Sequence, residues 1–165
     1  MILTGETYQP LIAPERTVAE VTLRSVVFGL AMTVLFSAAA AYIALKLGQG
    51  VETAIPIAIL AVGLSALVTA GGRRPSTLLE NLQVATLGAT AGIVVGGSVF
   101  VMPAIFVLGL EARSGFSQIF LVPFLGAVLG VMFLIPFRRY FVAEMHGKLP
   151  FPEATATTEI LVTGE

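Results

Sequence analysis

This chain of 165 residues contains no cysteine and no aspartate, and it has a single histidine. Without cysteine it can form no disulfide, and it cannot supply thiolate ligands to a zinc or iron–sulfur site. With one histidine and no aspartate it also lacks the parts of a nucleophilic triad, a zinc hydrolase site or a carboxylate pair for phosphoryl transfer. We therefore expect neither an enzyme nor a resident metal or other cofactor.

Charged residues are scarce as well. They make up 12% of the chain, against about 25% in soluble domains, and the mean hydropathy is +0.95. The charges fall almost wholly between four uncharged stretches, residues 26–45, 53–72, 82–110 and 115–137. Each stretch is long enough to cross a bilayer core, which takes about 20 apolar helical residues. The sequence therefore predicts an all-α, polytopic transmembrane helix bundle whose first partner is the lipid bilayer.

The positions of lysine and arginine predict the orientation. A cytoplasmic N-terminus would leave only Lys46 and Arg113 on the opposite side of the membrane. The positive-inside rule then places residues 1–25 and the linker that begins at residue 138 in the cytoplasm, with four transmembrane segments over residues 26–137 between them. The first residues do not resemble a signal peptide. We expect a plasma (inner) membrane protein, with no nucleic acid among its partners.

Small residues recur at helical spacing in three of the stretches. The first carries a ladder at every fourth position, Gly29, Thr33, Ser37 and Ala41. The fourth has Gly126 and Gly130, whereas the second reads as a plain spanning helix. Such ladders let two helix backbones approach closely, so we expect these faces to pack on protein. Arg73 and Arg74, after the second stretch, are expected to contact lipid phosphates.

The third stretch is too long for one straight helix. It has no charge between Glu80 and Glu111, and at about 1.5 Å per residue it would exceed a core of about 30 Å. It must tilt, bend or break, with Gly88, Gly92 and Gly96 available for close packing and Pro103 for an interruption. Interrupted segments of this kind hold transport sites, but a long tilted helix with a proline kink is an open alternative. The short connector at 111–114 predicts an antiparallel hairpin with the fourth stretch.

The last part of the chain changes character. Pro150 and Pro152 interrupt the linker, and Pro152 suits the first position of a new helix with Glu153 beside its positive end. Thr155 and Glu159 then fall on one face of that helix, together with Thr158. This helix is cut short at residue 165. We therefore expect the chain to be the front piece of a larger membrane protein, with the remainder of that protein as a partner.

Three motifs in order resemble the oligopeptide transporter family, which includes the yellow-stripe-like metal-chelate transporters. They are HGKLPFPEATATTEILVTGE at 146–165, TLRSVVFGL at 22–30 with AYIALKLG at 41–48, and EN at 80–81 leading to FVMPA at 100–104. The chain departs from the family at Ala40, Ala85 and Ala154, where asparagine, glutamine and glycine are common. Two of these differences remove polar side chains at membrane depth, so the substrate can differ from that of the better-known branches.

The resemblance implies a secondary active transporter, of which this chain is the N-terminal portion. Its expected substrates are small peptides or metal chelates, imported with protons. No G-x-x-x-x-G-K-[ST] phosphate loop is present, in agreement with an ion gradient as the energy source. Because the chain offers no set of metal ligands, a metal would arrive inside its chelator. The alternative from another class is a membrane-embedded scaffold or assembly subunit that works by helix packing alone.

The candidate substrate-binding residues form two groups, each with a structural alternative. Glu153 and Glu159, with Thr155, could bind a proton or the cationic end of a peptide, or they could serve as a helix cap and a helix-packing face. Asn81, Gln83 and Thr86 could present amide and hydroxyl groups to a peptide, or they could simply begin a helix. Two further polar residues are expected to have ordinary roles, Tyr42 as an interfacial anchor and His146 as a solvated linker residue.

Overall fold

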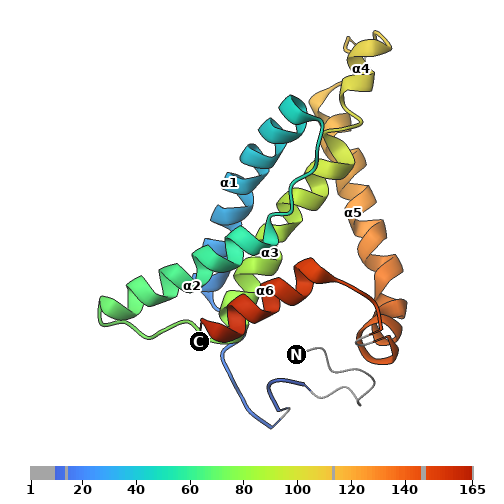
Figure 1. Cartoon of the computed structure of the whole chain (residues 1–165). Coiled ribbons are helices and arrows are strands. Elements are labelled where there is room, and N and C mark those ends of the chain that lie inside the picture. Colours follow the sequence, from blue (N-terminus) through green and yellow to red (C-terminus); the bar gives the residue numbers. More distant parts are fainter. Residues whose placement is uncertain (1–9, 14, 113, 146–147, 165) are drawn as a thin grey trace. The chain divides into compact units, whose positions relative to one another are not determined.

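The computed structural model of this chain describes residues 10–13, 15–112, 114–145 and 148–164. Within these ranges it holds helices and no β-strand, which confirms the predicted all-α fold (Figure 1). The chain divides into two compact units. The larger is Val18–Leu108 with Pro152–Glu165, and the smaller is Met1–Thr17 with Gly109–Phe151. His146 and Arg113 lie outside the described residues, so the expectations for them stay predictions.

Helix α1, Leu23–Leu47, is delimited by a cap at each end. At its start Thr22 Oγ1 accepts a hydrogen bond from the Ser25 backbone N–H at 3.2 Å, and Ser25 Oγ accepts one from the Thr22 N–H at 3.0 Å. At its end Gly48 adopts a left-handed conformation, φ +67°, and donates its N–H to Ala44 O at 2.9 Å. These caps satisfy groups that the helix leaves unpaired. Between these caps the helix extends beyond both ends of the apolar stretch at 26–45.

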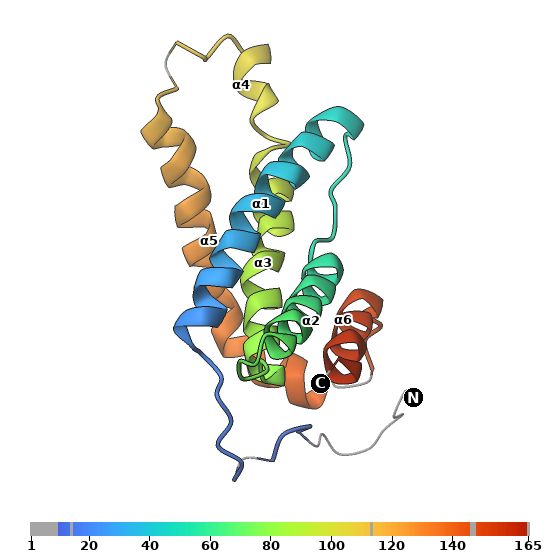
Figure 2. The same ribbon diagram turned by 90° about the vertical axis from the view of Figure 1, so that its left-hand side faces the viewer.

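Helix α3, Leu78–Ser98, lies beside α1 and runs in the same direction (Figures 1 and 2). The contact is close: a Cβ placed on Gly29 would lie 2.6 Å from Leu87 Cδ1. Thr33 Oγ1 lies 2.9 Å from Leu87 O, where it donates a hydrogen bond between the helices. Further along, Ala40 and Ala44 are buried against Val95. The ladder of small residues on α1 therefore packs on protein, as its spacing predicted.

Helix α2, Ala54–Ala70, begins beside the middle of α3. The chain first returns from the end of α1 in a non-helical segment along α3 (Figure 1). In that segment Val51 O would lie 2.6 Å from a Cβ on Gly92, and Thr53 Oγ1 donates to Gly88 O at 3.4 Å. This segment lies almost wholly before the second apolar stretch, which it overlaps only at Thr53. At 17 residues α2 falls among the shorter apolar helices, and its role as a plain spanning helix stays a prediction.

Three helical segments within the described residues are long and apolar enough to span a membrane: Leu23–Leu47, Leu78–Val107 and Phe116–Glu144. The second of these is interrupted, because α3 ends at Ser98 and a short helix α4, Pro103–Val107, follows after a turn. Pro103 has no N–H to continue the hydrogen-bond ladder. The predicted break is therefore present. Of the glycines proposed for close packing, a Cβ placed on Gly88 or Gly92 would lie 2.5 or 2.6 Å from a neighbouring atom, whereas one on Gly96 would meet nothing within 4 Å.

Helix α6, Pro152–Thr163, begins at Pro152 as predicted and packs against α2 (Figures 1 and 2). A Cβ on Gly164 would clash with Val62 Cγ1, so the end of α6 touches the middle of α2. Leu161 is the fully buried side chain of this helix. Leu161 thus faces the bundle, whereas Val162 is exposed.

The smaller unit contains α5, Phe116–Arg139, and a π-helical turn, Tyr140–Glu144. The rings of Phe116, Phe120 and Phe124 stack along α5, with centroids 6.5 and 5.8 Å apart. The π-helical turn closes with the Met145 N–H donating to Tyr140 O at 3.0 Å. The hairpin of α5 with the third stretch, and close packing at Gly126 and Gly130, stay predictions.

Candidate functional site

Glu80, in the first turn of α3, joins three separate parts of the larger unit. Its Oε1 accepts a hydrogen bond from Thr22 Oγ1 at 2.6 Å and forms an ion pair with Arg74 Nη2 at 2.8 Å. Its Oε2 accepts from the Thr77 backbone N–H at 2.9 Å, and Thr77 Oγ1 accepts from the Glu80 N–H at 3.1 Å. The start of α1, the α2–α3 connector and the start of α3 therefore meet on one carboxylate.

The burial of Glu80 explains why it needs so many partners. Its side chain is 2% exposed, whereas that of Arg74 is 55% exposed. A buried carboxylate is costly unless it is paired and hydrogen-bonded, and both Glu80 oxygens are. Thr77 and Glu80 have the spacing of a capping box, so the sequence does contain a signal for Glu80, although Glu80 was not among the predicted site residues.

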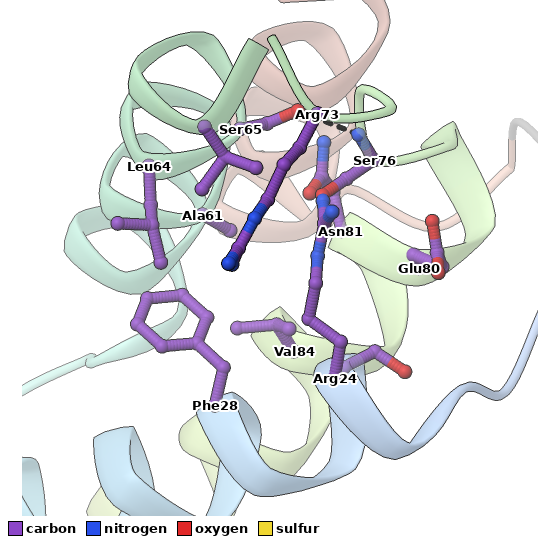
Figure 3. Close-up of a pocket in the computed structure, with 12 residues that line it drawn as sticks. Arg24, Phe28, Ala61, Leu64, Ser65, Arg73, Ser76, Glu80, Asn81 and Val84 are labelled. Atoms are coloured by element: carbon purple, nitrogen blue, oxygen red, sulfur yellow. Dashed lines mark hydrogen bonds between the residues drawn. The ribbon is translucent and has the colours of Figure 1, made fainter. Parts of the chain in front are cut away.

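A pocket of about 200 Å³ lies next to Glu80, between α1, α2 and α3 (Figure 3). Phe28, Ala61, Leu64 and Val84 give it an apolar floor. Arg24, from α1, donates to Arg74 O at 3.0 Å and to Ser76 Oγ, which fixes its guanidinium at the edge of the pocket.

Two polar groups that line the pocket have no partner in the described part of the chain. Asn81 is 4% exposed, yet its carboxamide makes no hydrogen bond there. Arg73, from the α2–α3 connector, makes no side-chain hydrogen bond or ion pair among the described residues. In Figure 3 its guanidinium extends into the space near Phe28 and Leu64. The pocket thus combines a free cation and a free amide above apolar side chains.

The other proposed site residues lie outside this pocket. Gln83 is half-buried on α3, and Thr86 is exposed and donates its hydroxyl to Leu82 O at 2.8 Å. Glu153 and Glu159 are exposed on α6, and neither forms an ion pair with a described residue.

Thr155 is exposed on α6 as well. The structure therefore brings Asn81 alone among the six into the pocket. Two of the positions that depart from the resembled family, Ala40 and Ala85, are each 2% exposed and so are fully buried in the helix bundle.

These features define an all-α, multi-pass membrane protein with one interrupted span and two shorter helices, α2 and α6, packed beside it. The sequence profile of the OPT oligopeptide transporter proteins matches residues 20–165. The chain belongs to this family, and it is therefore not a member of an enzyme family. The predicted resemblance is confirmed.

One curated relative is a Haemophilus influenzae protein named "Putative oligopeptide transporter", 33% identical to this chain over 123 residues. The match covers 74% of this chain and 18% of that protein, so the chain spans less than a fifth of the relative's length. No solved structure was found to match the chain.

Proposed function

We propose that this chain is part of a secondary active transporter that moves small peptides or peptide-like metal chelates across a membrane, driven by protons. The observation that carries the proposal is the family match, which extends over residues 20–165 and so includes both α3 and α6. We further propose that the N-terminus is cytoplasmic in a plasma (inner) membrane, on the distribution of lysine and arginine.

The packing of the short helices supports this proposal. The chain enters α2 beside Gly88 and Gly92, in the middle of a membrane-spanning helix. The first turn of a helix leaves backbone N–H groups without intrahelical partners. Transporters use helix ends at such positions to meet polar substrates inside the membrane.

We assign the proposed roles as follows. Glu153 and Glu159 lie on the exposed side of α6 and supply carboxylates for a proton or for the amino end of a peptide. Thr155, on the same helix, supplies a neighbouring hydroxyl. Asn81, Gln83 and Thr86, in the first half of α3, supply polar groups for the substrate backbone.

The test is uptake into proteoliposomes that contain the full-length protein. Labelled dipeptides, longer peptides and a peptide-like iron chelate are offered with and without an inward proton gradient. We expect one of these classes to accumulate only with the gradient. If none accumulates under any gradient, the proposed function is wrong.

The roles of the carboxylates are tested separately with Glu153→Gln and Glu159→Gln. At least one replacement should abolish uptake or remove its dependence on pH, because glutamine keeps the shape of the side chain but cannot take up a proton. Glu111→Gln is the matched control, since Glu111 lies exposed in a connector. If both replacements match this control in rate and pH profile, the assigned roles are wrong even where transport itself is observed.

A further inference from the structure

We propose that the pocket between α1, α2 and α3 binds an oxyanion, with a phosphate group as the chemical class. The proposal concerns a site apart from the α6 carboxylates, shares only Asn81 with the residues proposed to bind the transported substrate, and does not rest on the transport activity. It rests on the free guanidinium of Arg73, the second guanidinium of Arg24, and the unpartnered carboxamide of Asn81 around one cavity.

The charge around the pocket is positive. Glu80 also lines it, but its charge is balanced by Arg74, which lies 2.8 Å from Oε1. Arg24 bonds only to neutral oxygens, the Arg74 carbonyl and the Ser76 hydroxyl. Arg24 and Arg73 thus leave two positive charges without a carboxylate partner among the described residues. The N-termini of α1 and α3 both lie at this end of the bundle, and their dipoles add to the positive potential.

Asn81 gives the pocket a directed hydrogen-bond donor. Asn81 is 4% exposed, and its carboxamide lines the pocket without a hydrogen bond to a described residue, so the amide is free to bond to a ligand there. Its NH₂ group can donate to an oxyanion held by the guanidinium of Arg73. The pocket volume of about 200 Å³ has room for a phosphate-sized group.

The apolar floor limits the kind of ligand. Phe28, Leu64 and Val84 lie under the polar groups and can contact hydrocarbon attached to the anion. Basic pockets between transmembrane helices bind the headgroups of anionic lipids. The same polar groups would also take a soluble phosphate. The structure thus points to a phosphate group as the ligand, carried either by a lipid headgroup or by a soluble molecule.

The experiment measures the thermal unfolding temperature, Tm, of the full-length protein. One arm compares nanodiscs of phosphatidylcholine with nanodiscs that contain phosphatidylglycerol, and the other titrates inorganic phosphate against chloride of equal ionic strength. We expect ligand to raise Tm, and Arg73→Gln to weaken binding about fivefold, since one basic residue near an anionic surface contributes about 1 kcal/mol. A rise with phosphatidylglycerol alone identifies a lipid headgroup, and a rise with inorganic phosphate identifies a soluble source.

Two variants keep the result interpretable. Arg138→Gln removes an equal charge from α5, outside the pocket, and should leave binding unchanged. Asn81→Leu should weaken binding as Arg73→Gln does, because it removes the amide donor. Arg73 is exposed and unbonded, so its replacement tests the site without loss of folding. The proposal is overturned if neither ligand raises Tm, or if Arg73→Gln and Arg138→Gln behave alike.

Discussion

The hydroxyl of Thr22, at the start of α1, donates a 2.6 Å hydrogen bond to Oε1 of Glu80 across 58 positions of the sequence. The same Oε1 receives Arg74 from the α2–α3 connector. One buried carboxylate therefore fixes the relative position of two parallel helices. Glu80 also lines the pocket proposed to hold an oxyanion.

Glu80→Gln should destabilise the protein by about 1–3 kcal/mol, because glutamine keeps the shape but loses the charge-assisted bonds to Thr22 and Arg74. Thermal unfolding of the full-length protein measures the change, with Glu111→Gln as the exposed control. Arg74→Gln combined with Glu80→Gln should cost less than the sum of the two single changes. Strict additivity would show that the ion pair contributes nothing.

Gly92→Ala should destabilise the bundle, since the new Cβ would lie 2.6 Å from the carbonyl oxygen of Val51, a backbone atom that cannot turn aside. Overpacking of this kind costs about 1–3 kcal/mol. Gly96→Ala, one turn further along α3, meets nothing within 4 Å and should be neutral or slightly stabilising. Equal unfolding temperatures for the two variants would contradict the close approach at Gly92.

Thr33→Val should weaken the contact between α1 and α3, because it removes the hydroxyl that bonds to Leu87 O at 2.9 Å while keeping the volume of the side chain. Hydrogen bonds between membrane helices contribute about 0.6 kcal/mol on average and up to about 1.7 kcal/mol. The control is Thr69→Val, whose hydroxyl bonds only within its own helix, to Ser65 O. A difference in unfolding free energy between them measures the interhelical bond, and no difference would argue against it.

Introduced cysteines test the packing of α6 on α2. Since this chain has no cysteine of its own, a Val62→Cys, Gly164→Cys pair should cross-link readily under mild oxidation, because a Cβ on Gly164 would be in direct contact with the Val62 side chain. Leu60→Cys with Gly164→Cys should not, because Leu60 lies on another side of α2 and is 45% exposed. Mobility on a gel before and after reduction reports the cross-link. Equal yields from both pairs would show that α6 is not held in this position.

The sequence was sufficient for much of the architecture. The length and apolar character of the stretches predicted the helices, and Pro103 and Pro152 predicted where one helix breaks and another begins. The ladder on α1 predicted a protein contact, which Gly29 and Thr33 make with Leu87. Of the proposed site residues, Asn81 lies in a pocket, whereas the roles of Gln83, Thr86, Glu153, Thr155 and Glu159 stay predictions.

By itself, then, the sequence determined the family, the membrane class and most helix ends, because hydropathy, capping and proline act over one or two helical turns. Only the tertiary structure decided that α2 begins beside the middle of α3, that Glu80 joins α1 to α3, and that Arg24, Arg73 and Asn81 share a cavity. These are contacts between residues far apart in the chain. No local pattern encodes them, because they depend on how helices pack and on where the chain between them returns.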